Sequence, residues 1–519
     1  MSHIITAIID IGSNTVRLVL YKYNKDEGLH EFGNIKTVAR LRSYIQPNGE
    51  MSEEGIQVLE ETLKSFKKII EDYQVSSIKA CATAAIRQAT NREEIIRRME
   101  IETGISIECL SEEQEAYFGF LAVIHSMDTP SAVTIDIGGG STEITLFINK
   151  EIYHSISFPF GTVSLKQQFV SGEKINQEEL RALHHFVENQ LRQLSWLHNI
   201  ELPVIGIGGS ARNLAQIHQH LIDYPVSGVH QYEMSDLILK DLRSHLGKKT
   251  IDEMKQIDGL SSDRSDIIEI ALEVFITIME VVNTSTFQIS KNGLREGIII
   301  NLVSEHVPDA FNPYQVFENQ ARRLAYEYGR TEEEVKNFVN LTEQMYRECC
   351  RLQLFDFQED HLELILNAAK VYSIGEYIEL DSSNQHTFYL IANQSIAGLN
   401  HRDRVKLALL ASYKNKDYFR RFSKPFSAWF TKEQLKTLRD FGALLKFVYA
   451  FNVSKRNVVK KLQLEMKDDC LWIYVYANDG AMAEKYRAEI QKKHIEKLFK
   501  KTVQIEFFEG KGYDIWSEN

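Results

Sequence analysis

The first 305 residues or so alternate short runs of β-branched residues with stretches of helical periodicity. Such alternation is typical of an α/β architecture. Residues 4–10 (IITAIID) and 16–23 (VRLVLYKY) predict two strands joined by the short turn IGSNT. Further strands are expected over 78–83 and 105–110, and a helix over about 53–73.

Capping signals mark where several helices begin. Ser52 precedes two glutamates and is expected to cap the helix that follows it. Asn91 and Glu94 have the spacing of a capping box, and so do Ser111 and Gln114. Each of these pairs therefore predicts a helix start.

A later segment repeats the opening pattern. TIDIGGGSTEITLF (134–147) echoes AIIDIGSNTVRLVL (7–20): a strand, Asp-Ile-Gly, small polar residues and another strand. The segment MDTPS near residues 128–131 separates the two copies. We therefore expect two related lobes whose Asp-Ile-Gly turns face a common cleft.

The chain changes character after about residue 308. Residues 312–452 have almost entirely helical periodicity, and strands return from about residue 456 around a helix near 481–499. The expected fold is α/β, with an all-α domain and a small terminal α/β domain following the two lobes. The expected domains are residues 1–128, 129–308, 309–455 and 456–519.

Composition narrows the class of protein. Of the 519 residues, 44% are apolar and 25% are charged, as in an ordinary soluble globular protein. The formal net charge of −12 disfavours general nucleic-acid binding. The absence of an 18-residue apolar run and of a basic leader predicts a cytoplasmic protein without a membrane span. The five cysteines form no CxxC pair, which disfavours a zinc site or a disulfide framework.

The first candidate site is the turn that follows Asp10. A glycine in a tight turn lets backbone N–H groups point outward, and the side chains of Ser13 and Asn14 add donors. Such a turn suits a phosphate oxygen. Taken alone, it is more often a plain hairpin.

The second candidate combines glycines with carboxylates. Asp136 and Glu143 flank three consecutive glycines, whose entropic cost makes sense where the backbone must approach a ligand closely. Two carboxylates with water and substrate phosphate suit Mg²⁺. We therefore expect Asp136 and Glu143 to bind the metal. The residues expected to bind substrate here are Gly138, Gly139, Gly140, Ser141 and Thr142.

The third candidate is a strand-to-helix turn containing Gly208, Gly209 and Ser210. Amide donors and a helix N-terminus at one point favour an anion. Alone this signal is weak, but it is the third such turn in one α/β half.

Two charged side chains complete the set. Glu115 lies in the first turn of the helix that Ser111 caps, where a glutamate usually interacts with the helix dipole. At the edge of a cleft it could instead be a general base that takes a proton from water. Arg87 ends the small-residue segment CATAAIR and is either a surface arginine or a bidentate partner of phosphate.

Together these segments resemble one family. DIGSNTVRLVLY, ATAAIRQATN, LSEEQEAYFG, DIGGGSTEI, GIGGSARN, QIDGLSSDRSDII and NGLREGII look like the ordered motifs of the exopolyphosphatase/guanosine pentaphosphate phosphatase (Ppx/GppA) family. The resemblance covers residue 4 to about residue 300. It implies two ribonuclease-H-like lobes of the actin, Hsp70 and sugar-kinase type, and Mg²⁺-dependent hydrolysis of a terminal phosphoanhydride.

The resemblance also implies roles for individual residues. Glu115 matches the catalytic base, Asp136 and Glu143 match the metal-binding carboxylates, and Arg87 matches a substrate-contacting arginine. One departure is Gln114, which stands where the family usually has glutamate. The phosphate-binding loops match Ser13, Asn14, Gly138–Ser141 and Gly208–Ser210.

The helical region resembles the HD-like third domain of the family. Where a metal-binding HD domain has a His-Asp pair, this chain has Tyr372 and Ser373, which cannot replace those ligands. His386 alone is more often structural. We expect no catalytic metal here, and the expected roles are packing, homodimer formation or holding a long substrate.

The resulting hypothesis is an exopolyphosphatase that releases orthophosphate from inorganic polyphosphate. The main alternative is removal of the 5′ γ-phosphate of pppGpp, which would use the same motifs. Less favoured are an ATP-dependent kinase of the same superfamily and a non-catalytic sensor of (p)ppGpp in the stringent response. The sequence leaves open whether a monovalent cation also stimulates the reaction.

Overall fold

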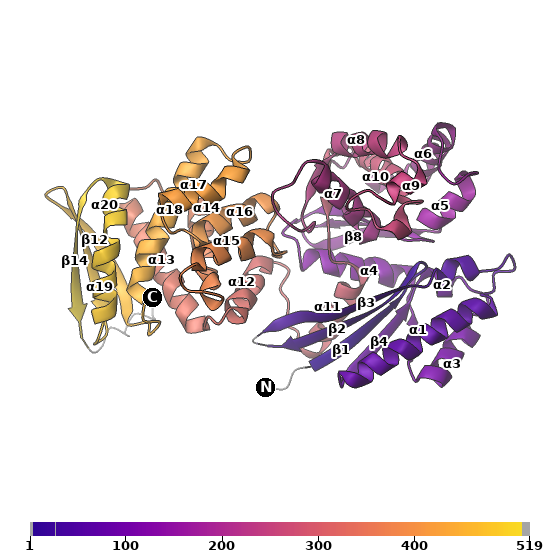
Figure 1. Ribbon diagram of the computed structural model, residues 1–519, viewed down its shortest axis with the longest axis horizontal. Helices are drawn as coiled ribbons and strands as arrows, with labels where there is room; N and C mark the ends of the chain where they lie inside the picture. Colours follow the sequence, from indigo (N-terminus) through magenta and orange to yellow (C-terminus); the bar gives the residue numbers. More distant parts are fainter. Residues whose placement is uncertain (1–3, 26, 511–519) are drawn as a thin grey trace. The chain divides into compact units, whose positions relative to one another are not determined.

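The computed structural model describes residues 4–25 and 27–510 and divides into two compact units (Figure 1). The first unit contains the chain up to Tyr224 and Gly228–Val316. The second contains Pro225–Ser227 and the chain from Phe317 onward. Each unit is described by itself below.

The first unit begins with a five-stranded sheet in the order β3-β2-β1-β4-β5. The first three strands form an antiparallel meander, and β4 and β5 continue the sheet in parallel. The strands are β1 (Ile4–Ile11), β2 (Thr15–Asn24), β3 (Gly28–Val38), β4 (Ser77–Ala82) and β5 (Ile107–Cys109). The helices around it are α1 (Glu53–Asp72), α2 (Ala84–Arg87), α3 (Arg92–Thr103), α4 (Glu112–Ile124) and α11 (Leu294–His306), with a 3₁₀ turn η1 (Leu41–Tyr44).

Helices cover both faces of this sheet, which explains the unbroken apolar run of β1. Successive strand residues point to opposite faces. Ile9 accordingly packs in a cluster with Leu63 of α1, whereas Ile8 packs in another with Phe118 of α4 and Ile299 of α11. Two separate hydrophobic clusters therefore hold one sheet.

The second sheet has the order β10-β11-β9-β6-β7-β8. Its meander β6-β7-β8 and parallel strands β9 and β11 repeat the topology of the first sheet, with β10 added at the edge. The strands are β6 (Ala132–Ile137), β7 (Thr142–Ile148), β8 (Glu151–Phe158), β9 (Val204–Ile207), β10 (Glu233–Ser235) and β11 (Thr286–Ile289). The helices are α5 (Thr162–Phe169), α6 (Gln177–Leu191), α7 (Gly208–Leu221), α8 (Asp236–Gly247), α9 (Ile251–Met254) and α10 (Ile268–Val282), with 3₁₀ turns η2 (Ser195–Leu197) and η3 (Ser262–Arg264).

The register of the two hairpins shows how closely the lobes correspond. Asp10 pairs with Arg17 across β1 and β2, and Asp136 pairs with Glu143 across β6 and β7. Arg17 and Glu143 therefore occupy equivalent positions in the two copies. The internal repeat expected from the sequence is confirmed, with a carboxylate of one lobe replaced by a guanidinium in the other.

One expected helix cap is wrong. Asn91 precedes α3, but its side chain makes no capping hydrogen bond. Instead its Oδ1 accepts a hydrogen bond from the N–H of Met51 at 3.0 Å, and its Nδ2 donates to the carbonyl oxygen of Met51 at 3.1 Å. The Asn91 side chain thus binds the backbone of Met51 and not the start of the helix that the local spacing had indicated.

The second unit begins with helices, as expected for this region. They are α12 (Val316–Glu327), α13 (Glu332–Arg351), α14 (Glu359–Lys370), α15 (Ser383–Asn393), α16 (His401–Ala411), α17 (Lys416–Ser423) and α18 (Lys432–Tyr449), with 3₁₀ turns η4 (Ile374–Tyr377), η5 (Lys424–Phe426) and η6 (Ala450–Asn452). A small sheet in the order β12-β13-β14 follows, from β12 (Val459–Lys467), β13 (Cys470–Ala477) and β14 (Thr502–Glu509). The crossover between the parallel strands β13 and β14 is α19 (Met482–Gln491) and α20 (Lys493–Phe499).

Helix α13 covers the open edge of this small sheet. Gln344 Oε1 accepts from the N–H of Leu462 at 2.8 Å, and Glu348 Oε2 accepts from the N–H of Leu464 at 2.7 Å. These bonds satisfy backbone donors that an edge strand would otherwise leave unpaired. The sheet is therefore joined to the helices within one unit.

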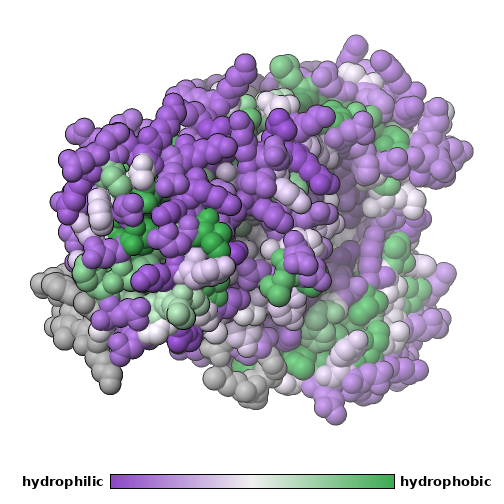
Figure 2. All heavy atoms as spheres, turned by 60° about the vertical axis from the view of Figure 1, so that its left-hand side comes forward, coloured by the Kyte–Doolittle hydropathy of each residue, from purple (hydrophilic) through white to green (hydrophobic). Residues whose placement is uncertain are grey.

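Hydrophilic residues cover most of the face seen in Figure 2, and hydrophobic residues gather there only in small groups. No helix in the ranges 4–25 and 27–510 is long and apolar enough to cross a membrane.

Candidate active site

The two Asp-Ile-Gly turns lie against each other. A Cβ atom on Gly139 would be 3.0 Å from the Cβ of Ser13, so a side chain here would crowd Ser13. A Cβ on Gly140 would be 3.7 Å from the Cβ of Ala84. Within the described part of the chain, the backbone N–H groups of Ser13, Asn14, Gly139 and Gly140 have no acceptor. Two turns in contact therefore leave four backbone donors unpaired, which suits phosphate oxygens.

Helix α5 supports the glycine turn from behind. The N–H groups of Thr162 and Val163 donate to the carbonyl oxygens of Gly138 and Gly139 at 2.9 and 3.0 Å. Gly161 comes so close that a Cβ on it would lie 2.5 Å from the Gly138 oxygen. The carbonyl groups are thus bound on the α5 side, which leaves the N–H groups available to a ligand.

The third glycine turn, between β9 and α7, lies beside the second Asp-Ile-Gly turn. Gly208 has a φ of +88°, and a Cβ there would lie 2.7 Å from Oδ1 of Asp136. Arg264 crosses Gly209 and donates from Nη1 to the hydroxyl oxygen of Ser210 at 3.2 Å. The sequence predicted these residues as a phosphate loop, and the structure brings them beside the predicted metal-binding aspartate.

Three carboxylates line one small cavity. Glu115 of α4, Asp136 of β6 and Glu143 of β7 surround a space of about 30 Å³. Burial raises the pKa of Asp136 to about 6 and, opposed by Arg87, that of Glu115 to about 7. Burial, with repulsion by Glu115 and Asp136, raises the pKa of Glu143 to about 8. The folded chain thus brings together three carboxyl groups whose ionisation burial disfavours.

This donor set fits a hard divalent cation. Magnesium prefers carboxylate oxygens and keeps several water or phosphate ligands. In the described ranges no group of three or more histidine, cysteine, aspartate or glutamate side chains is arranged to hold a metal. Asp136 and Glu143 would therefore hold such an ion only together with water and substrate oxygens.

Arg87 lies against the predicted base instead of projecting to the surface. Its Nη1 donates to Glu115 Oε1 and, at 3.0 Å, to the carbonyl oxygen of Leu110. Its Nη2 is buried without a hydrogen bond, 3.7 Å from a carboxylate oxygen of Glu112. The guanidinium thus has one donor group occupied by Glu115 and another that a phosphate could use.

Gln114 has a structural reason to differ from glutamate. It completes the predicted capping box with Ser111, accepting from the Ser111 N–H at 2.8 Å. Its Nε2 donates to Glu108 Oε1 at 3.2 Å, and Glu108 also pairs with Lys79. A glutamate at this position would place two carboxylates together, so the amide preserves the start of α4 and with it the position of Glu115.

Four arginines that the sequence analysis did not single out also converge here. Arg295 Nη1 pairs with Asp10 Oδ2 at 3.1 Å, so Asp10 holds a guanidinium in the cleft. Burial, with repulsion by Arg295, Arg17 and Arg264, lowers the pKa of Arg212 to about 10. Buried Nε atoms of Arg17 and Arg295 have no hydrogen-bond partner. This crowding of positive charge suits a polyanion.

A sequence signal for these arginines did exist. Each lies within or directly beside a segment already quoted: NTVRLVL, GSARN, SSDRSD and NGLREG. The role of a glycine in such a segment depends on the backbone of its immediate neighbours, so the sequence alone indicates it. An arginine's role depends on tertiary neighbours, which the spacing of one segment does not reveal.

Family comparisons agree with this geometry. The Ppx/GppA phosphatase family model matches residues 21–306, and the model of Ppx/GppA phosphatase domain III matches residues 316–479. The chain belongs to the Ppx/GppA phosphatase family. The resemblance read from the motifs and the α/β fold with a helical third domain are thereby confirmed.

Individual relatives of the Ppx/GppA family match a little more than half of this chain. A bifunctional 3-dehydroquinate synthase/phosphatase of Fusobacterium nucleatum is 28% identical over 313 residues, 58% of this chain and 46% of the relative. The chain thus spans about half the length of that relative. A crystal structure of the Aquifex aeolicus family member is 27% identical and covers 59% of this chain and 99% of its own, with a TM-score of 0.53. An exopolyphosphatase from Cytophaga hutchinsonii, 24% identical, covers 58% and 98% with a TM-score of 0.53 and shows the shared fold.

The predicted loss of HD ligands falls in domain III of this Ppx/GppA chain. Tyr372 is buried, and its carbonyl oxygen accepts a hydrogen bond from Arg330. His386 Nε2 lies 3.1 Å from the hydroxyl of Ser382 on the same helix turn. Both thus have local structural partners, and the expectation that this domain holds no catalytic metal stays a prediction.

Proposed function

We propose that this chain hydrolyses the terminal phosphoanhydride of inorganic polyphosphate and releases orthophosphate. The observation that carries the proposal is the meeting of three glycine turns beside a cavity lined by Glu115, Asp136 and Glu143. Turn amides and arginines bind phosphate, while a buried carboxylate beside them can take a proton.

In this reaction a water molecule attacks the terminal phosphorus. Arg87 first releases the Glu115 carboxylate and binds a substrate phosphate instead. The freed carboxylate of Glu115 then accepts the proton of that water. The free N–H groups of the two Asp-Ile-Gly turns hold the terminal and penultimate phosphates. The phosphoanhydride bond breaks, and the shortened chain leaves with its oxygen as an anion. Asp136 and Glu143 would hold a Mg²⁺ ion, which would supply positive charge to neutralise phosphate oxygens.

Polyphosphate is favoured because of the arginines. Arg17, Arg212, Arg264 and Arg295 concentrate positive charge at the site, and this suits a ligand with several adjacent phosphate groups. The cleft chemistry needs only a terminal phosphoanhydride, so pppGpp is tested in the same assay. Phosphate release without any acceptor distinguishes hydrolysis from obligatory kinase transfer.

The decisive experiment measures phosphate release by wild type and Glu115→Gln. Substrates are polyphosphates of several lengths and pppGpp, each with and without Mg²⁺. We expect Glu115→Gln to lose at least about 100-fold in kcat, because the proton acceptor is gone. Glu113→Gln is the matched control, since Glu113 is exposed and lies two residues before Glu115 on the same helix.

Retained activity in Glu115→Gln would contradict the role of this residue. Faster release from pppGpp than from every polyphosphate would contradict the substrate. Unchanged circular dichroism of both variants shows that the comparison concerns chemistry and not folding.

A further inference from the structure

Two side chains of the first lobe donate to the same oxygen atom of the second lobe. Lys36 Nζ of β3 lies 2.9 Å from Oδ2 of Asp263, and Asn14 Nδ2 lies 3.4 Å from that same oxygen. Asp263 belongs to the 3₁₀ turn η3, between α9 and α10. An ammonium and an amide that converge on one anionic oxygen are also the groups with which proteins hold a phosphate oxygen.

The strand register places Lys36 on the side of the sheet that carries Asp10. Asp10 pairs with Arg17 across β1 and β2, and Arg17 pairs with Lys36 across β2 and β3. Residues directly opposite each other on neighbouring strands share a face of the sheet. Asp10 also forms an ion pair with Arg295 at 3.1 Å. Lys36 therefore lies on the face that contributes Asp10 to the site.

The second lobe has a matching row of residues. Asp136 pairs with Glu143 across β6 and β7, and Glu143 pairs with Ser157 across β7 and β8. Lys36 thus occupies in the first lobe the position that Ser157 has in the second. The row of the second lobe contains the two carboxylates of the candidate metal site, whereas the row of the first lobe contains two cations, Arg17 and Lys36. A phosphate ligand needs cations of this kind.

Asp263 carries a negative charge in this position. Burial opposes its ionisation, but the hydrogen bond from Lys36 and the charges of Lys36 and Arg264 outweigh burial and lower the pKa of Asp263. The Asp263 side chain is 13% exposed and that of Lys36 is 31% exposed. The carboxylate therefore touches water, and it lies in a turn of three residues. It can leave Lys36 when another anion takes its place.

The sheet edge at β3 is on the way out of the site for a long substrate. β3 is the outer strand in the order β3-β2-β1-β4-β5. The side chain of Glu115, which meets the terminal phosphate in the proposed reaction, is only 12% exposed. A chain whose end reaches Glu115 must therefore extend toward more exposed residues. Lys36 is such a residue, and it lies directly beside the turn that contains Asn14.

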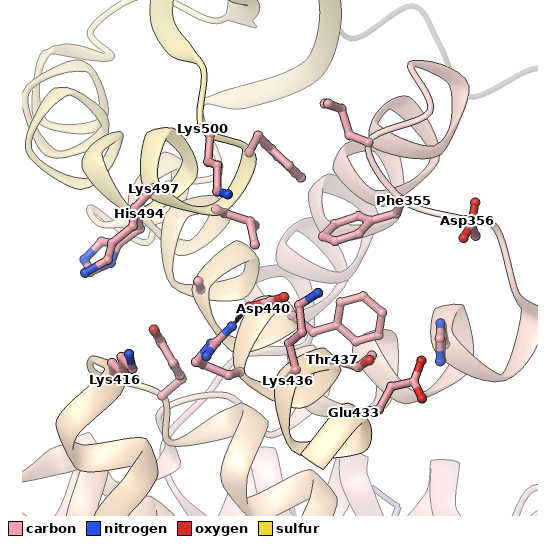
Figure 3. A pocket seen from close by; sticks show the side chains of 18 of the residues that line it. Phe355, Asp356, Lys416, Glu433, Lys436, Thr437, Asp440, His494, Lys497 and Lys500 are labelled. Atoms are coloured by element: carbon pink, nitrogen blue, oxygen red, sulfur yellow. Dashed lines mark hydrogen bonds and ion pairs between the residues drawn. The ribbon is translucent and has the colours of Figure 1, made fainter. Parts of the chain in front are cut away.

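Lysines also line a pocket of about 1050 Å³ in the second unit. Figure 3 shows Lys497 and Lys500 at one side of that pocket and Lys416 and Lys436 at the other. Within the described part of the chain these four lysines make no hydrogen bond or ion pair, so nothing directs their ammonium groups to a common point. Lys36 is different, because it and Asn14 are held on one oxygen.

We propose that Lys36 and the Asn14 amide bind a third phosphate group of the substrate chain, and that Asp263 occupies this site in the free protein. The proposal rests on the proposed function, in which turn N–H groups hold the terminal and penultimate phosphates. An incoming phosphate oxygen takes the position of Asp263 Oδ2, and the displaced carboxylate turns toward water. Lys36 and Asp263 therefore affect substrate binding and not proton transfer at Glu115.

The test is an equilibrium titration of the full chain in the Glu115→Gln background, which suppresses turnover. The probes are pyrophosphate and tripolyphosphate. Lys36→Met should weaken tripolyphosphate binding about three- to tenfold, because a charge-assisted contact at a partly exposed site is lost. Pyrophosphate binding should stay near the value of the parent protein. Asp263→Asn should tighten tripolyphosphate binding about threefold, because a competing anion is removed.

Two matched controls carry the same charge changes at exposed positions. Lys68→Met lies on α1, and Asp266→Asn lies three residues after Asp263. Both should leave the affinity for tripolyphosphate near that of the parent protein. Unchanged circular dichroism of all variants shows that the comparison concerns binding and not folding.

A double variant separates competition for Lys36 from repulsion at a distance. Asp263→Asn should tighten tripolyphosphate binding much less once Lys36→Met is present, because no ammonium remains to compete for. A full threefold gain in the double variant would overturn the role of Asp263. Unchanged affinity for tripolyphosphate in Lys36→Met would overturn the site itself, and so would equal weakening of pyrophosphate and tripolyphosphate.

Phosphate release by the chain with its native Glu115 tests the proposed function separately. Lys36→Met should raise KM on polyphosphate and leave kcat unchanged. A lowered kcat with an unchanged KM would contradict a role in binding. Tripolyphosphate binding that depends on Lys36, in a chain that releases no phosphate, would contradict the proposed function and uphold the site.

Discussion

At the scale of single residues, the site in the first unit brings together buried groups of both signs whose charged forms are disfavoured. The pKa values of Glu115, Asp136 and Glu143 are raised, while that of Arg212 is lowered. Each shift disfavours the charged form, because burial and like-charged neighbours leave it unbalanced. A phosphate ligand together with a cation would balance both sets at once.

Arg87 is expected to contribute to substrate binding as well as to holding Glu115. Arg87→Met removes the guanidinium but keeps an apolar stem of similar length. We expect kcat/KM on polyphosphate to fall by about ten- to a hundredfold, because a charge-assisted contact to phosphate is lost. Initial rates over a range of substrate concentrations measure this. Arg97→Met, an exposed position on α3, controls for the charge change, and an unaltered kcat/KM in Arg87→Met would contradict the role.

His125, at the end of α4, makes stability depend on pH. Burial, with repulsion by Lys150, lowers the pKa of His125 from 6.5 to about 4. Between about pH 6.5 and pH 4, His125 is therefore protonated in the unfolded chain but stays neutral in the folded chain. The free energy of unfolding is therefore undiminished by this group above pH 6.5. It falls as the pH drops toward about 4, by roughly 3 kcal/mol at most.

A variant isolates the contribution of His125. His125→Leu cannot be protonated, so its loss of stability between about pH 7.5 and pH 5 should be smaller than that of wild type. Urea unfolding at the two pH values measures the difference. His185→Gln should behave as wild type, because the His185 side chain is 75% exposed. Equal pH dependence of His125→Leu and wild type would show that other groups cause it.

At the scale of elements, the start of α4 connects stability with catalysis. Ser111 Oγ accepts from the N–H of Gln114 at 3.2 Å, and Glu115 follows in the same turn. Ser111→Ala should lower the free energy of unfolding by about 1 kcal/mol. It should also lower kcat, because the first turn carries the base. Urea unfolding and phosphate release measure the two effects.

Ser111→Thr is the matched control for this helix start. Threonine also caps helices, so both stability and kcat should stay near wild-type values. A fall in stability without any change in kcat in Ser111→Ala would show that the position of Glu115 does not depend on the cap.

The sequence predicted those elements whose signals are local. The glycine turns, the Ser52 and Ser111 caps and the paired hairpins all follow from neighbouring residues, and the structure confirms them. The third meander strands β3 and β8 were not predicted, because they are largely exposed and carry no apolar run. Asn91 was misassigned as a cap because Met51, 40 residues away, binds its side chain.

The candidate site divides in the same way. Glycine and carboxylate positions could be read from single motifs, since backbone geometry and charge act locally. The pairing of Arg87 with Glu115, 28 residues later, could not, because it depends on how α2 and α4 approach each other. The same holds for Arg295 with Asp10, which are 285 residues apart. Contacts between side chains that are far apart in the sequence can be predicted only once the fold is known.

At the scale of the whole molecule, all residues assigned to the cleft belong to the first unit. The cleft begins with Asp10 and ends with Arg295, and this unit ends at Val316. The Aquifex aeolicus family member matches 59% of this chain over 99% of its own length. Almost all of that folded chain thus matches little more than half of this one.

We therefore expect a fragment that ends at Val316 to fold and to release phosphate from short polyphosphates. Its hydrophobic clusters and all the proposed catalytic residues are retained. Circular dichroism and rates on several chain lengths, beside those of the full chain, measure this. Because the second unit is a candidate for holding a long substrate, the fragment should lose more activity on long chains than on short ones. A folded fragment that is inactive on every length would show that the second unit is required for the chemistry itself.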